Sequence, residues 1–130
     1  SESPSLFYDV AHNPGGINAI LSTIQTIYKC NPVGLFVMKE DKETEMIASA
    51  IKGRFESLII SGDENYGLMT ASQLAKALKK NGIDDFTVEN SIINAMVQFS
   101  NKSKKLNIPG VIFGSHYIAK EVFDKFGFLV

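Results

Sequence analysis

Hydrophobic residues along the chain fall into two kinds of pattern. Short continuous apolar runs, typical of strands buried on both faces, predict strands at residues 6–10, 33–38, 57–61, 86–88 and 109–113. Apolar residues at steps of three and four, typical of one helix face, predict helices at residues 17–28, 46–51, 70–78, 92–105 and 118–126. Each predicted strand is therefore followed by a predicted helix.

This repeated strand–helix order predicts an α/β fold. We expect a three-layer, Rossmann-like open sheet of five mostly parallel strands with helices on both faces. Residues 1–130 contain no linker, internal repeat or low-complexity segment, so we expect a single domain. Thr70 is a suitable N-cap for the third helix, and Asn81-Gly82 is a suitable stop for it.

Composition excludes several classes of protein. Lys and Arg number 13 and Asp and Glu number 14, and this near-neutral balance argues against nucleic-acid partners and against a polybasic membrane surface. No apolar run approaches the roughly 20 residues that a membrane-spanning helix needs. The single cysteine, Cys30, cannot form a disulfide within the chain, which fits a cytoplasmic protein.

Polar residues collect where the predicted strands end, which is where ligands bind in open parallel sheets. They are Asp9, His12, Asn13, Lys39, Glu40, Asp41, Lys42, Ser61, Asp63, Glu64, Glu89, Asn90, Ser115 and His116. Each can equally be explained as a turn cap, an ordinary loop residue or a solvated helix start. Gly15-Gly16 could hold an anion on free N–H groups, but the segment is neither a G-x-G-x-x-G nor a Walker A loop. Nor do the histidines and carboxylates show a metal-ligand spacing.

Three segments resemble one known family. Asp9-Val10-Ala11-His12-Asn13-Pro14 resembles the Asp-x-Ala-His-Asn-Pro signature in the C-terminal domain of the Mur ligase superfamily, and most closely that of folylpolyglutamate synthase, which is often bifunctional with dihydrofolate synthase. Residues 37–43 are similar to the family's strand and Asp-Lys-Asp turn, and residues 114–122 to its Gly-Ser-x-Tyr-Leu-x-x-Glu-Val stretch. The resemblance extends over residues 5–126.

The resemblance implies an ATP-dependent ligase that adds L-glutamate to folate or dihydropteroate through an acyl phosphate. This chain would be its C-terminal domain, closing over the protein's own N-terminal and central ATPase domain. ATP and Mg²⁺ would be bound mainly by that central domain, and the chain alone would be inactive.

The resemblance also implies roles for individual residues. Asp9 and Asn13 would bind the nucleotide, with Asp9 near the ribose. His12 would be catalytic, lying near the phosphates and the incoming glutamate. Ser115 would bind the amino acid with His12, and Lys42 would be a possible anion contact. No residue of the chain would be a metal ligand.

Two alternatives remain open at this point. The chain could be the C-terminal domain of a peptidoglycan Mur-type ligase for another amino acid, although such ligases usually carry an arginine-rich loop where this chain has Lys39-Glu40-Asp41-Lys42. It could also be a degenerate, non-catalytic interaction module, because Tyr66-Gly67 stands where the family has a Pro-Arg pair.

Overall fold

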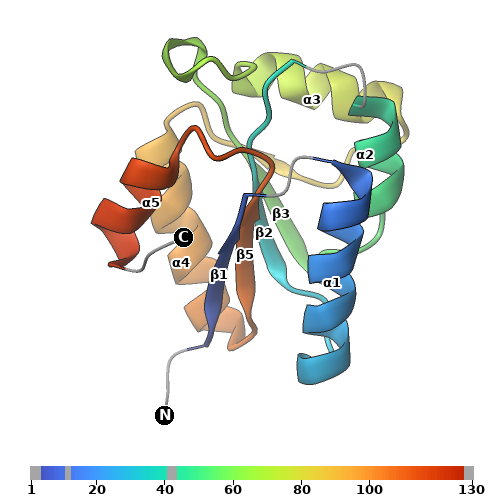
Figure 1. The fold of residues 1–130 in the computed structure, drawn as a ribbon, viewed down its shortest axis with the longest axis vertical. Coiled ribbons are helices and arrows are strands. Elements are labelled where there is room, and N and C mark those ends of the chain that lie inside the picture. The colour runs from blue at the N-terminus through green and yellow to red at the C-terminus, as the bar shows by residue number, and fades with distance from the viewer. Residues whose placement is uncertain (1–3, 11–12, 41–43, 128–130) are drawn as a thin grey trace.

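The structure is a computed structural model that describes residues 4–10, 13–40 and 44–127. In chain order its elements are β1 (Leu6–Asp9), α1 (Pro14–Tyr28), β2 (Val33–Phe36), α2 (Thr44–Ile51), β3 (Ser57–Ile60), the 3-10 helix η1 (Glu64–Tyr66), α3 (Ala71–Lys80), β4 (Thr87–Val88), α4 (Ile92–Leu106), β5 (Gly110–Phe113) and α5 (Ala119–Phe126). The five strands form one sheet in the order β1-β5-β2-β3-β4, shown in Figure 1. All of the described strand pairings are parallel.

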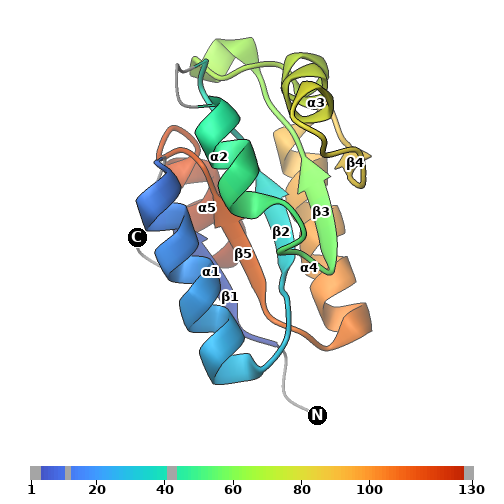
Figure 2. The same cartoon turned by 90° about the vertical axis from the view of Figure 1, so that its right-hand side faces the viewer.

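Helices cover both faces of this sheet. Figures 1 and 2 show α1 and α2 against one face, and α4 and α5 against the other. Side chains in β2 and directly after it alternate accordingly: Phe36 and Met38 join the core under α1, α2 and α3, whereas Leu35 and Val37 join the core under α4 and α5. The predicted three-layer α/β class is thus confirmed.

Local sequence explains where the helices begin. Thr70 Oγ1 accepts the N–H of Gln73, and Gln73 Oε1 accepts the N–H of Thr70, which completes a capping box at the start of α3. The predicted N-cap is therefore confirmed. The helix η1 was not predicted, because its turn is held by Asp63 Oδ1 accepting the N–H of Asn65 rather than by any hydrophobic periodicity.

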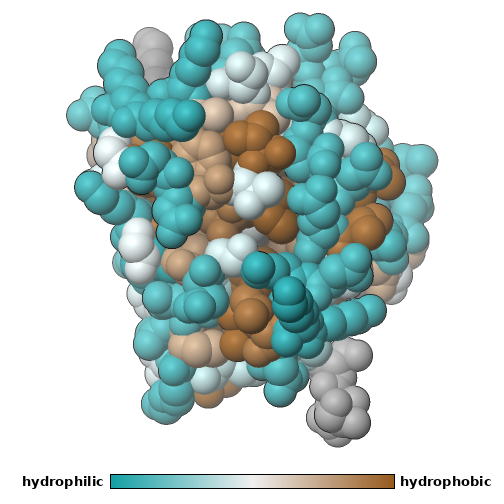
Figure 3. Space-filling model, turned by 180° about the vertical axis from the view of Figure 1, so that it is seen from behind, coloured by the Kyte–Doolittle hydropathy of each residue, from teal (hydrophilic) through white to brown (hydrophobic). Residues whose placement is uncertain are grey.

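The surface is mixed in character. Figure 3 shows hydrophobic surface in the middle of the rear face, surrounded by hydrophilic side chains. The large apolar side chains exposed on the surface include Val88 in β4, and Ile93 and Val97 one turn apart on α4. Within the described ranges, no helix combines the length and the apolar character needed to cross a lipid bilayer.

Candidate functional site at the carboxyl edge of the sheet

The candidate site lies at the carboxyl ends of β1 and β5. These strands are neighbours, with Asp9 in register with Phe113. The chain leaves β1 toward α1 on one face of the sheet and leaves β5 toward α5 on the opposite face. Neighbouring parallel strands that are followed by helices on opposite faces mark the point where open α/β sheets bind ligands.

The loop after β1 leads directly into α1. Asn13 is the N-cap of this helix, since its Oδ1 accepts the N–H of Gly16 at 2.8 Å, and Pro14 occupies the first turn. This bond uses the Gly16 N–H, so that group is not available to an anion as the sequence had suggested. Asp9 is partly buried at the end of β1. His12 lies outside the described residues.

The loop after β5 makes a tight turn at Gly114. Its φ is +107°, and a Cβ at this position would overlap the carbonyl oxygen of Val37. Only glycine adopts this conformation and allows this approach of two backbones without strain. The Gly-Ser pair thus has a structural cause, because the glycine brings Ser115 next to the end of β2.

Ser115 is buried, with 4% of its surface exposed. Its Oγ accepts the N–H of Tyr117 at 3.0 Å, and this bond leaves the hydroxyl hydrogen available for a ligand. Its carbonyl oxygen accepts the hydroxyl of Tyr8 at 2.6 Å. Burial, together with the charge of Glu121, raises the pKa of Tyr8 to about 12, so this hydroxyl remains a donor at neutral pH.

A small cavity of about 20 Å³ adjoins this turn. It is lined by Lys39 from the end of β2 and by residues 114–117. The exposed imidazole of His116 meets the ring of Tyr117 edge to face, with ring centroids 4.7 Å apart. Lys39 and His116 are thus brought beside Ser115, although the residue roles expected from sequence included neither. The sequence signal that could have identified Lys39 and His116 is their position directly after two predicted strands.

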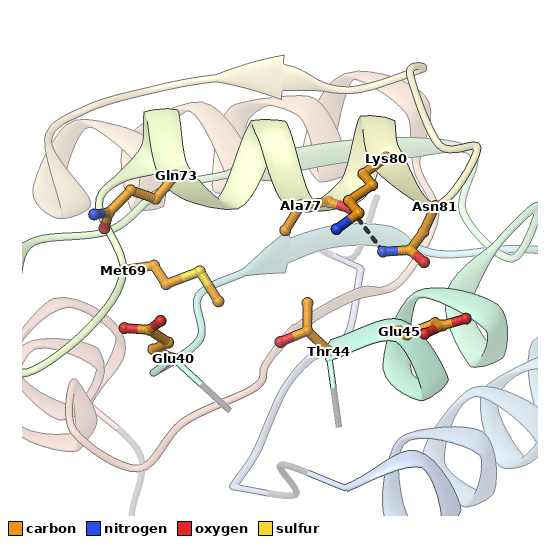
Figure 4. Close-up of a pocket in the computed structure, with 8 residues that line it drawn as sticks. All are labelled: Glu40, Thr44, Glu45, Met69, Gln73, Ala77, Lys80 and Asn81. Carbon is orange, nitrogen blue, oxygen red and sulfur yellow. Dashed lines mark hydrogen bonds between the residues drawn. The ribbon is translucent and has the colours of Figure 1, made fainter. Parts of the chain in front are cut away.

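A second, larger cavity of about 390 Å³ lies between α2 and α3. Figure 4 shows Glu40, Thr44 and Glu45 on one side of it, with Gln73 and Lys80 projecting from α3 on the other. Lys42, the expected anion contact, lies outside the described residues.

The structure brings Asp9 and Ser115 to the same edge of the sheet, with Asn13 at the adjoining helix start. Their roles in binding remain predictions. Among residues 4–10, 13–40 and 44–127, no group of three or more His, Cys, Asp or Glu side chains is arranged to hold a metal ion.

Fold and site together define an open-sheet α/β domain whose candidate site lies where β1 and β5 end beside each other. The family model described as "Mur ligase, glutamate ligase domain" matches residues 1–106. The chain belongs to this family. The match includes Asp9 and Asn13 and ends before β5, so Ser115 lies beyond it.

Solved structures share this fold. Folylpolyglutamate synthase of Mycobacterium tuberculosis, complexed with ADP and AMPPCP, aligns with a TM-score of 0.77 at 22% identity over 95% of this chain and 30% of its own. E. coli FolC in complex with ADP gives a TM-score of 0.76 at 24% identity over 96% of this chain and 30% of its own. A bifunctional folylpolyglutamate synthase/dihydrofolate synthase with Mn, AMPPNP and L-glutamate bound gives 0.80 at 19% identity, over 98% of this chain and 30% of its own.

The chain thus spans about 30% of the length of these enzymes. At these identities the likeness is one of fold. A search of curated proteins gave no significant match.

Proposed function

We propose that this chain is the C-terminal domain of an ATP-dependent ligase that joins L-glutamate to a folate. In the complete protein it closes over a central ATPase domain and completes the nucleotide and amino-acid sites there. By itself the domain is inactive, because the P-loop and the folate pocket lie on that other domain.

The observation that carries this proposal is that the strand ending at Asp9 lies beside the strand that leads into Ser115. The Asp9–Pro14 motif falls within the family match, and the turn at Ser115 lies beside it across the β1–β5 pair. The first loop suits a nucleotide, with Asp9 toward the ribose and His12 toward the phosphates. The second suits an amino-acid carboxylate, which would accept the Ser115 hydroxyl hydrogen beside the positive charge of Lys39.

The reaction has two steps. The substrate carboxylate attacks the γ-phosphorus of ATP, which forms an acyl phosphate and releases ADP. The amine of glutamate then attacks the acyl carbon, phosphate leaves, and the nitrogen loses a proton to give the amide. Negative charge gathers around the transferred group, so the work of the protein is positioning and charge neutralisation.

Mg²⁺ is the expected counter-charge for the phosphates. In this proposal the metal is held mainly by the central domain. When bound there, Mg²⁺ neutralises the phosphate oxygens. The residues of this chain orient the nucleotide and the incoming amine.

The choice of amino acid tests the proposal. The complete protein, given ATP and a folate, should release ADP in the presence of L-glutamate and not in the presence of diamino acids, measured by a coupled ADP assay. ADP release with a diamino acid would favour a peptidoglycan-type ligase. An absence of ADP release with every amino acid, or a reading frame without a P-loop upstream, would favour a non-catalytic interaction module.

A further inference from the structure

Glu121, in the first turn of α5, has an unusual environment. Its Oε1 accepts the hydroxyl of Tyr66 at 3.0 Å. Its Oε2 is excluded from solvent and has no hydrogen-bond partner in the described structure. A buried carboxylate oxygen without a donor is costly, so its presence calls for a role.

The carboxylate lies among groups that hold the turn after β5. Tyr8, on the edge strand β1, donates its hydroxyl to the carbonyl oxygen of Ser115, 107 positions away in sequence. The charge of Glu121 contributes to the raised pKa of Tyr8 and also to that of Tyr66, where the hydrogen bond to Glu121 is the first cause. Both phenols therefore lie within the electrostatic reach of one carboxylate.

The 3-10 helix joins the same arrangement. Tyr66 is its last residue, and Gly67 follows in a left-handed conformation against the ring of Tyr117. The Tyr66–Glu121 bond therefore ties η1 to α5, and the Tyr8–Ser115 bond ties β1 to the turn between β5 and α5. Two segments that are distant in sequence, β1 and η1, are thus tied to this turn and the helix that follows it.

We propose that Glu121 is a positioning residue that acts with Tyr8 and Tyr66 to hold the turn at residues 114–117, and hence the Ser115 hydroxyl, in the geometry that binds the amino acid. The inference rests on the proposed function for the identity of the ligand. Glu121 does not touch the ligand. It acts through the turn: its hydrogen bond with Tyr66 fixes α5 to η1, and its charge acts on Tyr8, whose hydroxyl holds the Ser115 carbonyl.

Kinetics of the complete protein test the positioning role. Tyr8→Phe and Glu121→Ala should raise the KM for the amino acid about five- to tenfold, as expected for loss of one positioned hydrogen bond, with the KM for ATP changed less than about twofold. Glu121→Gln keeps an acceptor for Tyr66 and should restore most of the loss. Tyr28→Phe, at the far end of α1, is the matched control and should change neither constant.

Tyrosine titration followed by NMR on the same protein gives a readout independent of the reaction. Removing the charge with Glu121→Gln should lower the pKa of Tyr8. If the pKa of Tyr8 is the same in Glu121→Gln as in the unmodified protein, the proposed link between Glu121 and Tyr8 is wrong. A lowered pKa with an unchanged amino-acid KM in both Tyr8→Phe and Glu121→Ala overturns the positioning role. If the unmodified protein forms no amide, the proposed function is wrong, and the positioning role of Glu121 is wrong with it. The pKa of Tyr8 would still show whether the charge of Glu121 acts on Tyr8.

Discussion

At the scale of single residues, the candidate site depends on a glycine. A side chain at Gly114 would require a positive φ and would overlap the Val37 carbonyl. We predict that Gly114→Ala lowers the free energy of unfolding by about 3 kcal/mol or more, measured by denaturant titration. Gly53→Ala is the matched control: its φ is also positive, at +73°, but its Cβ would meet nothing within 4 Å, so its cost should be only about 1–2 kcal/mol. Equal costs for the two variants would contradict this account of the turn.

Tyr8 gives a second prediction at this scale. Its pKa is about 12 in the folded protein and 10.0 in the absence of structure, so the unfolded chain loses the phenol proton first as pH rises. The free energy of unfolding should therefore fall between about pH 10 and pH 12, with the contribution of Tyr8 fully present below that range. Tyr8→Phe should remove part of this slope in denaturant titrations across the range. An identical slope in the variant would show that Tyr8 is not the group responsible.

At the scale of elements, the capping box of α3 makes a testable contribution. Thr70→Ala removes the side-chain acceptor for the Gln73 N–H and should lower the free energy of unfolding by about 1 kcal/mol. Thr23→Ala is the control, because Thr23 is exposed inside α1 and bonds the Ala19 carbonyl within the same helix. Alanine is the better helix former there, so stability should be unchanged or slightly higher. A loss as large as that of Thr70→Ala would contradict the capping argument.

Helices and strands are also the features that the sequence predicted best. Apolar runs such as residues 33–38 and helical spacing such as residues 92–105 are local patterns, and the structure places strands and helices there. The helix η1 has no such pattern, since one Asx turn at Asp63 and a left-handed Gly67 hold it. The strand order could not be derived locally, because the place of β5 between β1 and β2 depends on packing between distant segments.

For the candidate site too, the sequence predicted the local features and not the contacts between distant segments. The sequence placed Asp9 and Ser115 at strand ends, and the fold confirms that these ends are neighbours. It assigned Asn13 to the nucleotide without showing that the side chain also caps α1. The part played by Tyr8 and Glu121 could not be seen, because Tyr8 resembles any strand residue until its partner 107 positions away is known.

At the scale of the whole molecule, the described residues form a three-layer α/β unit, and the chain spans only about 30% of the length of the similar enzymes. Under the proposed function, this unit would supply one wall of a site, with Asp9 facing the nucleotide and Ser115 facing the amino acid. A net charge of −1 fits this division, since most of the phosphate-binding groups are expected on another domain. The central claim therefore concerns the reaction that the complete protein is proposed to catalyse when this domain closes over the central ATPase domain.

Glutamate-dependent ADP release by the complete protein tests that claim most directly. With ATP and a folate present, the unmodified protein should release ADP on addition of L-glutamate. His12→Ala and Ser115→Ala should each lower the rate by more than about tenfold, as expected for groups that position or neutralise the reacting atoms. Ser72→Ala, exposed on α3, is the control and should leave the rate unchanged. Full activity in both site variants, or ADP release that ignores glutamate, would contradict the account.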